Sequence, residues 1–153
     1  MKLINIHNIS KDSEIELIPF KTDGMKIYVK YYSDGVQAGF PSPAEDYAEL
    51  PLSLDEKFLS KPESTYLVRV KSDSMEPTLI EGDILIVRSD LPITHNKIVI
   101  VSLNSDAFTV KRFLKTKDQN TLSPDNTKYK PVSIAEEDTV LYLGQVVSLV
   151  REF

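Results

Sequence analysis

The chain has 153 residues, of which 41% are hydrophobic and 27% are charged. This composition is typical of one folded globular domain with a short appendage, and it excludes a wholly disordered chain. With 18 Lys and Arg against 23 Asp and Glu, the net charge is −5, which argues against a basic surface that binds DNA directly.

The chain contains no cysteine and two histidines, His7 and His95. The lack of cysteine excludes disulfides, thiolate metal sites and a cysteine nucleophile, and it fits a reducing compartment. Two histidines are too few for a multi-histidine metal site, so we expect neither a metal nor a cofactor. Because no apolar run approaches the roughly 18 residues of a membrane span, we expect a cytoplasmic protein without a membrane anchor.

The N-terminal part, residues 1–38, is expected to be an extended arm. Two pieces look extended, residues 15–18 and residues 26–32, and no helical period is long enough for a helix-turn-helix. This part carries five Lys and five Asp or Glu, so the whole net charge of −5 lies in residues 39–153.

A connector and two short helices are predicted next. Residues 33–43 contain two glycines and two prolines, which indicate an exposed hinge. Residues 44–50 and residues 54–59 could each form one or two helical turns, the first of them ended by Pro51.

From Thr65 onward the chain reads as strands, because β-branched and aromatic residues dominate and turn residues separate the segments. We therefore predict a mainly β fold in which residues 39–153 form a compact domain. The predicted strands are residues 66–70, 84–88, 97–103, 107–114 and 140–150.

Ser74 lies in the segment with the most chemical information, residues 72–87, where a strand end and a polar turn lead into a buried strand. A serine just after a strand can present its hydroxyl at a cleft, with backbone N–H groups of the turn placed to receive an oxyanion. Taken alone, such a serine is more often an ordinary turn residue.

Lys111 is the second candidate, in the sequence Phe108-Thr109-Val110-Lys111, 37 residues after Ser74. Lysine titrates near about 10.4 and can remove a proton from serine only when it is neutral, which requires apolar surroundings. Residues 109, 111 and 113 share one face of a strand, so Phe113 is the nearest local apolar neighbour. Without the serine segment, an exposed strand lysine would be the simpler interpretation.

Together, Ser74-Met75, Gly82-Asp83 and the Phe-Thr-Val-Lys sequence resemble the LexA/UmuD family of self-cleaving Ser-Lys peptidases. The resemblance implies a β-rich peptidase domain of the LexA/UmuD C-terminal type. It also implies that Ser74 is the nucleophile and Lys111 the general base, with the backbone N–H groups of Asp73 and Ser74 as oxyanion donors.

The resemblance also implies a cleavage site, Ala38-Gly39, which lies 36 residues before Ser74 inside the connector. Small residues on both sides of a scissile bond let the backbone approach the serine closely. Cleavage there would remove residues 1–38 and leave residues 39–153.

The resemblance of this chain to the UmuD-like members of the family implies a role in the SOS response to DNA damage. It also implies a homodimer whose cleavage is stimulated by RecA filaments on single-stranded DNA. The trimmed form would then be an accessory subunit of a UmuC-like Y-family polymerase in error-prone translesion synthesis.

Two alternatives stay open. A LexA-like transcriptional regulator would need a DNA-reading domain, which the 38 strand-like residues before the cleavage site do not supply, so we expect no sequence-specific DNA binding. A non-catalytic β-rich binding module would use Ser74 as a turn residue and Lys111 as a surface charge.

Overall fold

The computed structural model describes residues 9–20, 24–29 and 51–153. The chain divides into two compact units, one made of residues 1–20 and 63–153 and the other of residues 21–62. Strands dominate the described residues, so the predicted mainly β fold class is confirmed.

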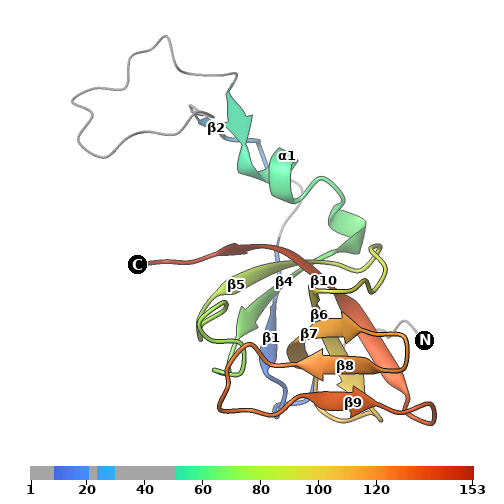
Figure 1. Ribbon diagram of the computed structural model, residues 1–153. Helices are drawn as coiled ribbons and strands as arrows, with labels where there is room; N and C mark the ends of the chain where they lie inside the picture. The colour runs from blue at the N-terminus through green and yellow to red at the C-terminus, as the bar shows by residue number, and fades with distance from the viewer. Residues whose placement is uncertain (1–8, 21–23, 30–50) are drawn as a thin grey trace. The chain divides into compact units, whose positions relative to one another are not determined.

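The described part of the larger unit is built on a sheet of eight strands, in the order β1-β4-β5-β10-β6-β7-β8-β9 (Figure 1). Every neighbouring pair is antiparallel. The strands are β1 (Ile15–Ile18), β4 (Thr65–Val70), β5 (Ile84–Arg88), β6 (Lys97–Leu103), β7 (Thr109–Lys115), β8 (Asn120–Ser123), β9 (Val132–Ile134) and β10 (Val140–Val150).

All five strands predicted after Thr65 are present, with ends that differ by at most two residues. The sequence analysis did not predict β8 and β9, which are partly polar and, at four and three residues, too short for an alternating pattern to be recognised. These two strands form because β8 pairs with β7 and β9 pairs with β8 at the edge of the sheet. Their backbone N–H and C=O groups form hydrogen bonds with the neighbouring strand. This pairing, and not local sequence preference, makes them strands.

Strand β1 was predicted as an extended piece of the N-terminal arm, and it is an edge strand of the main sheet. It pairs antiparallel with β4, with Ile15 opposite Val70 and Ile18 opposite Leu67. The side chain of Ile15 is 1% exposed, so the arm contributes to the core of the larger unit.

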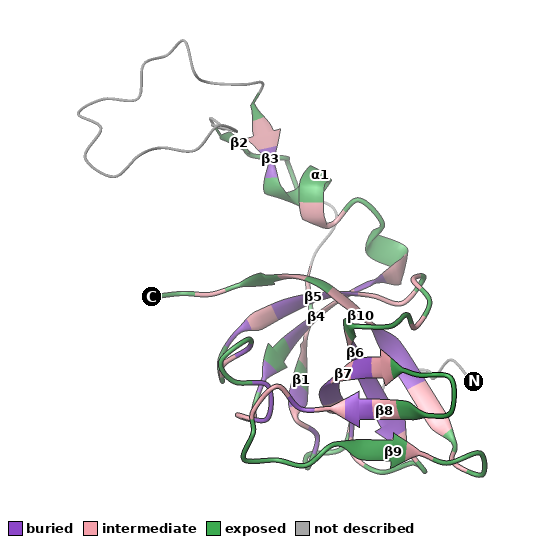
Figure 2. Cartoon of the chain, in the orientation of Figure 1, coloured by how far each residue is buried: buried purple, intermediate pink, exposed green. Residues whose placement is uncertain are grey.

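The core consists of two clusters of buried apolar side chains, which Figure 2 shows concentrated on the central strands. The larger cluster contains Ile15, Val68, Val70, Met75, Leu79, Leu85, Val87, Ile100, Phe108, Val110 and Leu143. The smaller cluster contains Val99, Val101, Phe113, Leu122 and Tyr142. Val99 and Ile100 are neighbours on β6 and belong to different clusters, because successive side chains of a strand point to opposite faces.

Strong curvature of the sheet brings distant strands together. In the strand order, β5, β10 and β6 lie between β4 and β7. Nevertheless, Glu14, which precedes β1, receives a hydrogen bond from Lys71 N–H after β4 and donates its own N–H to Phe108 O before β7, at 2.8 and 2.9 Å. The end of β4 and the start of β7 therefore face each other across one residue of the arm.

The smaller unit contains strands β2 (Tyr28–Val29) and β3 (Leu52–Ser53), which pair antiparallel, and the helix α1 (Leu54–Phe58). Helix α1 confirms the helical turn predicted for residues 54–59. Glu56 on this helix accepts hydrogen bonds from Lys26 Nζ at 2.6 Å and from Tyr28 OH at 3.0 Å.

Several sequence predictions lie wholly or partly outside the described residues. They are the hinge at residues 33–43, the helix at residues 44–50 and the second half of the extended piece at residues 26–32.

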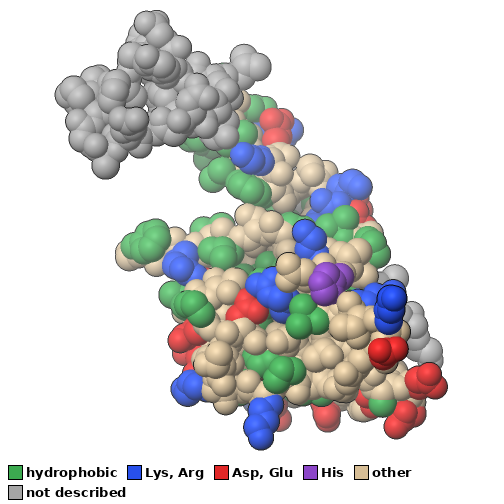
Figure 3. Space-filling view, in the orientation of Figure 1, with side chains coloured by type: hydrophobic (Ala, Val, Ile, Leu, Met, Phe, Trp, Pro, Cys, Tyr) green, Lys and Arg blue, Asp and Glu red, His purple; other side chains and the backbone are tan. Residues whose placement is uncertain are grey.

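The surface of the larger unit carries both signs of charge. On the face shown in Figure 3, both Lys and Arg side chains and Asp and Glu side chains are visible, separated by uncharged surface. In the described ranges, no helix has both the length and the apolar composition to cross a bilayer.

Candidate active site

Ser74 lies in the turn that follows β4, and apolar side chains from the same turn anchor it. Met75 and Leu79 are each 1% exposed and belong to the larger core cluster. The turn is closed by hydrogen bonds from Glu76 N–H to Asp73 O at 3.1 Å and from Leu79 N–H to Met75 O at 3.0 Å. Burial of these side chains fixes the backbone on which Ser74 is carried.

A second loop holds the Ser74 turn from the outside. The side-chain amide of Asn126 donates to Asp73 O at 2.8 Å, and the Asn126 N–H donates to Ser74 O at 3.1 Å. Asp125 accepts from Thr78 Oγ1 at 2.6 Å and from the Arg112 guanidinium at 2.6 and 2.9 Å. The turn is thus fastened to β7, which carries Arg112.

The Asp73 side chain points to this second loop. Its carboxylate accepts hydrogen bonds from Tyr129 OH and, at 3.3 Å, from Lys128 Nζ. The bond from Tyr129, opposed by partial burial and supported by Lys128, holds the pKa of the Asp73 carboxyl below its ordinary value. Asp73 therefore contributes a fixed negative charge to the loop.

Lys111 on β7 meets Ser74 directly. The distance from Lys111 Nζ to Ser74 Oγ is 2.9 Å, and the two residues are 9% and 1% exposed. Nζ also contacts Thr109 Oγ1 at 2.6 Å, as expected for side chains that share a strand face, and Val110 O at 3.0 Å. The structure thus brings together the two residues that the sequence singled out.

Glu14 is a member of the site that sequence reasoning missed. Its carboxylate lies 2.8 and 3.0 Å from Lys111 Nζ, and its Oε2 accepts from Thr109 Oγ1 at 2.6 Å and from Val110 N–H at 2.9 Å. Glu14 Oε2 is also 3.3 Å from Ser74 Oγ. Nothing in the local sequence pointed to this contact, because 97 residues separate Glu14 from Lys111.

The charge state of Glu14 follows from these contacts. Burial by itself raises the pKa of the Glu14 carboxyl, but hydrogen bonds from Lys111 and Thr109, the charge of Lys111 and the Val110 N–H outweigh it. The pKa therefore lies below its ordinary value. At neutral pH Glu14 is therefore a carboxylate, and it forms an ion pair with Lys111.

The backbone groups of Asp73 and Ser74 were predicted as oxyanion donors. The Ser74 N–H points to Ser72 Oγ at a long 3.4 Å, and Ser72 Oγ also lies 3.2 Å from Ser74 Oγ. A rotation of the Ser72 side chain would make the Ser74 N–H available to an oxyanion. The role of the Asp73 and Ser74 backbone N–H groups as oxyanion donors stays a prediction.

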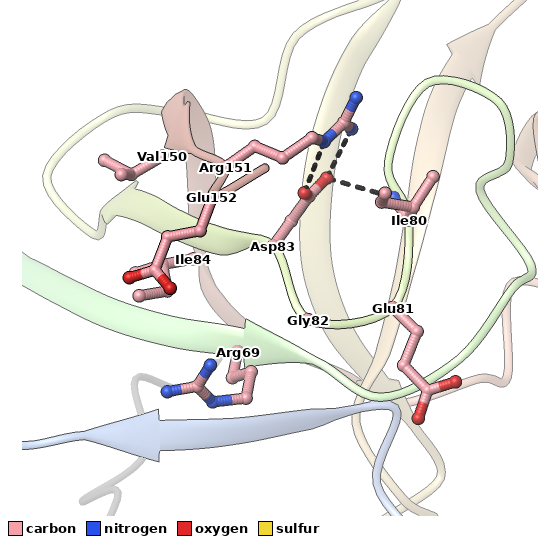
Figure 4. A pocket seen from close by; sticks show the side chains of 9 residues that line it. All are labelled: Arg69, Ile80, Glu81, Gly82, Asp83, Ile84, Val150, Arg151 and Glu152. Atoms are coloured by element: carbon pink, nitrogen blue, oxygen red, sulfur yellow. Dashed lines mark hydrogen bonds and ion pairs between the residues drawn. The ribbon is translucent and has the colours of Figure 1, made fainter.

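Asp83 has a structural role in the same segment, as Figure 4 shows. The side chain is 1% exposed and binds the Arg151 guanidinium through two hydrogen bonds of 2.6 Å. It also accepts from Ile80 N–H at 3.0 Å, and Gly82 beside it has a φ of +94°, a conformation that favours glycine. Asp83 thus links the turn before β5 to the C-terminal residues.

Phe113, predicted as the apolar neighbour of Lys111, lies two residues after it on β7 and packs in the smaller core cluster. His95 is exposed, and its Nδ1 accepts a hydrogen bond from Lys115 N–H at 2.9 Å. Ala38, Gly39 and His7 lie outside the described residues. Within the described ranges, no group of three or more His, Asp or Glu side chains could hold a metal ion.

The arrangement of Ser74 and Lys111 is the one that a serine hydrolase with lysine as its base requires: a hydroxyl within hydrogen-bond distance of an amine, in largely dry surroundings. A family model described as Peptidase S24-like matches residues 30–147. The chain belongs to this family. Membership supports a self-cleaving serine peptidase in general.

The chain is also similar to individual proteins. It is 39% identical to the protein ImpA of Escherichia coli over 127 residues, which are 81% of this chain and 81% of ImpA. It is 37% identical to the protein MucA of Salmonella typhimurium over 112 residues, 72% of this chain and 68% of MucA. It is 34% identical to LexA repressor 1 of Geobacter sulfurreducens over 118 residues, which cover 76% of this chain and 57% of the repressor.

Proposed function

We propose that the protein is a UmuD-like peptidase that cleaves its own chain between Ala38 and Gly39 with Ser74 and Lys111. The observation that carries the proposal is the 2.9 Å contact between Ser74 Oγ and Lys111 Nζ at a buried position. The match of the Peptidase S24-like model supports it.

The proposed reaction has two stages. Ser74 Oγ attacks the carbonyl carbon of Ala38 while its proton passes to the neutral amine of Lys111, and backbone N–H groups of Asp73 and Ser74 stabilise the oxyanion. The resulting ammonium donates a proton to the nitrogen of Gly39, which leaves. Water then hydrolyses the ester between Ser74 and Ala38, with Lys111 again accepting the proton.

The products would be residues 1–38 and residues 39–153. Because the scissile bond belongs to the chain itself, each chain would be cut once and would not turn over like a digestive protease. The biological result would be a changed interaction surface.

The similarity to ImpA and MucA over more than two thirds of each protein supports placing the chain with the UmuD-like proteins of SOS mutagenesis. In that role, the protein would be a cytoplasmic homodimer and RecA filaments on single-stranded DNA would stimulate its cleavage. The trimmed form would bind a UmuC-like Y-family polymerase during translesion synthesis. Copurification of the trimmed form with that polymerase from damaged cells would test the partnership.

A LexA-like regulator is the second candidate, since the chain is 34% identical to a LexA repressor. The match covers 57% of that repressor. Titration with promoter fragments separates the two, because a regulator of this kind binds particular DNA sequences and a UmuD-like protein does not.

Incubation of the purified protein at alkaline pH, followed by mass measurement of the fragments, tests the peptidase. We expect a break after Ala38 that is absent in Ser74→Ala and in Lys111→Ala. Ser60→Ala and Lys115→Ala, which change exposed residues of the same types, serve as matched controls and should cleave normally. A break that persists without Ser74 or Lys111 contradicts the mechanism and leaves the non-catalytic binding module as the better description.

A further inference from the structure

We propose that Glu14, with the strand β1 that follows it, is an autoinhibitory segment that lies against Ser74 and Lys111 and holds Lys111 Nζ in an ion pair in which it does not act as the base. This inference rests on the proposed Ser-Lys peptidase function. It explains the contact between Glu14 and Lys111, which has no role in the proposed hydrolysis.

The backbone of the segment lies between the end of β4 and the start of β7 in the manner of a bound peptide. Glu14 O accepts from Lys71 N–H at 2.8 Å, and Glu14 N–H donates to Phe108 O at 2.9 Å, so one residue pairs with the chain after β4 and the chain before β7. Ser13 adds a contact from Phe108 N–H to its Oγ at 3.1 Å, and β1 continues along β4. An extended peptide that adds to a sheet edge through its main chain is a common way for a protein to bind a peptide.

The Glu14 side chain points to the reacting groups. The carboxylate oxygen Oε2 of Glu14 accepts hydrogen bonds from Lys111 Nζ, Thr109 Oγ1 and Val110 N–H, and it lies 3.3 Å from Ser74 Oγ. An ammonium has no lone pair with which to take the proton of Ser74. In the ion pair with Glu14, at 2.8 Å, Lys111 Nζ donates to the Glu14 carboxylate and to Ser74 Oγ, the opposite of what a base of Ser74 must do.

Access to the nucleophile is restricted as well. Ser74 is 1% exposed, and Glu14 Oε2 lies 3.3 Å from its hydroxyl, so the segment lies where a scissile peptide would have to approach. Glu14 is the ionisable group that contacts Lys111 within the described residues; the other contacts of Nζ are the neutral Ser74 and Thr109 hydroxyls and Val110 O. Of the other charged and titratable groups of the Ser74 turn and the loop after β8, Lys128 Nζ and Tyr129 OH both donate to the Asp73 carboxylate.

Activation would therefore require Glu14 to leave Lys111, which releases Nζ from the ion pair and uncovers Ser74. The hydrophobic side chain next to Glu14 opposes this step, because Ile15 is 1% exposed in the core. In the uncleaved chain, β1 would therefore keep the site inactive. Cleavage after Ala38 would end the covalent link between β1 and residues 39–153.

The first test compares self-cleavage rates of the full chain across pH 7 to 10. Glu14→Gln keeps the size of the side chain and removes its charge, so we expect cleavage to be at least several-fold faster near neutral pH. Glu14→Ala should act in the same direction.

The matched control is Glu16→Gln, which removes the same charge from an exposed position of β1, two residues away. It should leave the rate and the pH profile unchanged. A Glu14→Gln protein that cleaves at the original rate or more slowly overturns the proposal, because Glu14 would then be neutral to catalysis or a contributor to it.

The second test measures Lys111 directly and does not depend on cleavage. In a Ser74→Ala background, trace acetylation at fixed pH labels amines in proportion to their neutral fraction, and peptide mass spectrometry compares Lys111 with the exposed Lys97. Glu14→Gln should raise Lys111 labelling several-fold, whereas equal labelling overturns the proposal. If labelling rises in the Ser74→Ala background but no Glu14 variant that retains Ser74 cleaves itself, the peptidase function is contradicted. The role of the Glu14–Lys111 contact is then still supported.

Discussion

Ser74 Oγ and Lys111 Nζ lie 2.9 Å apart, although they belong to a turn after β4 and to β7, which have three strands between them in the sheet. Curvature of the sheet produces this contact. Apolar burial on the turn, through Met75 and Leu79, and the Asn126 contacts hold the serine in position. The geometry of the site therefore depends on elements from the whole larger unit.

Replacing Lys111 with arginine separates the role of a base from that of a positive charge. Arginine keeps the charge and hydrogen-bond donors but does not lose its proton near neutral pH. We expect Lys111→Arg to lower the self-cleavage rate by about 10² to 10⁴, the usual contribution of a general base. Fragment masses followed over time measure the rate. Lys115→Arg, at an exposed position of the same strand, should cleave normally, and wild-type speed in Lys111→Arg would exclude lysine as the base.

Asn126 should affect the rate through the position of Ser74. Its side chain donates to Asp73 O at 2.8 Å, and Asn126→Ala removes that bond. Small displacements of a nucleophile cost up to about 100-fold in rate, so we expect a decrease of about 10-fold or more, with a stability loss near 1 kcal/mol. Rate measurement together with thermal unfolding checks both. Asn120→Ala, at an exposed position of β8, is the control and should change neither quantity.

Asp83 should make the protein sensitive to acid. Hydrogen bonds from Arg151, opposed by burial and supported by Ile80 N–H, hold the pKa of the Asp83 carboxyl below its ordinary value. A lowered pKa contributes stability that is present above the unfolded-state pKa of about 3.9 and is lost as pH falls through the folded-state value. Because Arg151 is partly exposed, we expect Asp83→Asn to lower the free energy of unfolding by about 1 to 3 kcal/mol at pH 7.

The difference between wild type and Asp83→Asn should shrink as the pH falls below about 4. Urea unfolding at pH 7, 5, 4 and 3 measures it. Asp118→Asn, at an exposed position, should match wild type throughout. A constant difference at all four pH values would show that the Asp83–Arg151 pair does not produce the acid sensitivity.

Gly144 on β10 is required because there is no room for a side chain. A Cβ at this position would lie 2.7 Å from both Arg88 O and Val87 Cγ1, so the backbone of β5 would have to shift. We expect Gly144→Ala to lower the free energy of unfolding by about 1 to 3 kcal/mol. Gly24→Ala is the control, since a Cβ there meets nothing within 4 Å. Chemical denaturation of both variants measures the difference, and equal stabilities would contradict the close approach of β10 to β5.

The sequence by itself determined the fold class, the long strands and the two residues proposed for chemistry. Runs of β-branched residues at β5, β6 and β10 predict buried strands. Such runs can be recognised from neighbouring residues alone. Ser74 and Lys111 were found because their neighbours and their separation along the chain resemble a known family.

Only the tertiary structure decided what surrounds that pair. Strands β8 and β9 are too short and polar to be recognised and exist because neighbouring strands supply hydrogen bonds. Glu14 contacts Lys111 from 97 residues away because β1 joins the edge of a curved sheet. No local pattern encodes such a contact, since the pairing of distant segments depends on the packing of the whole core.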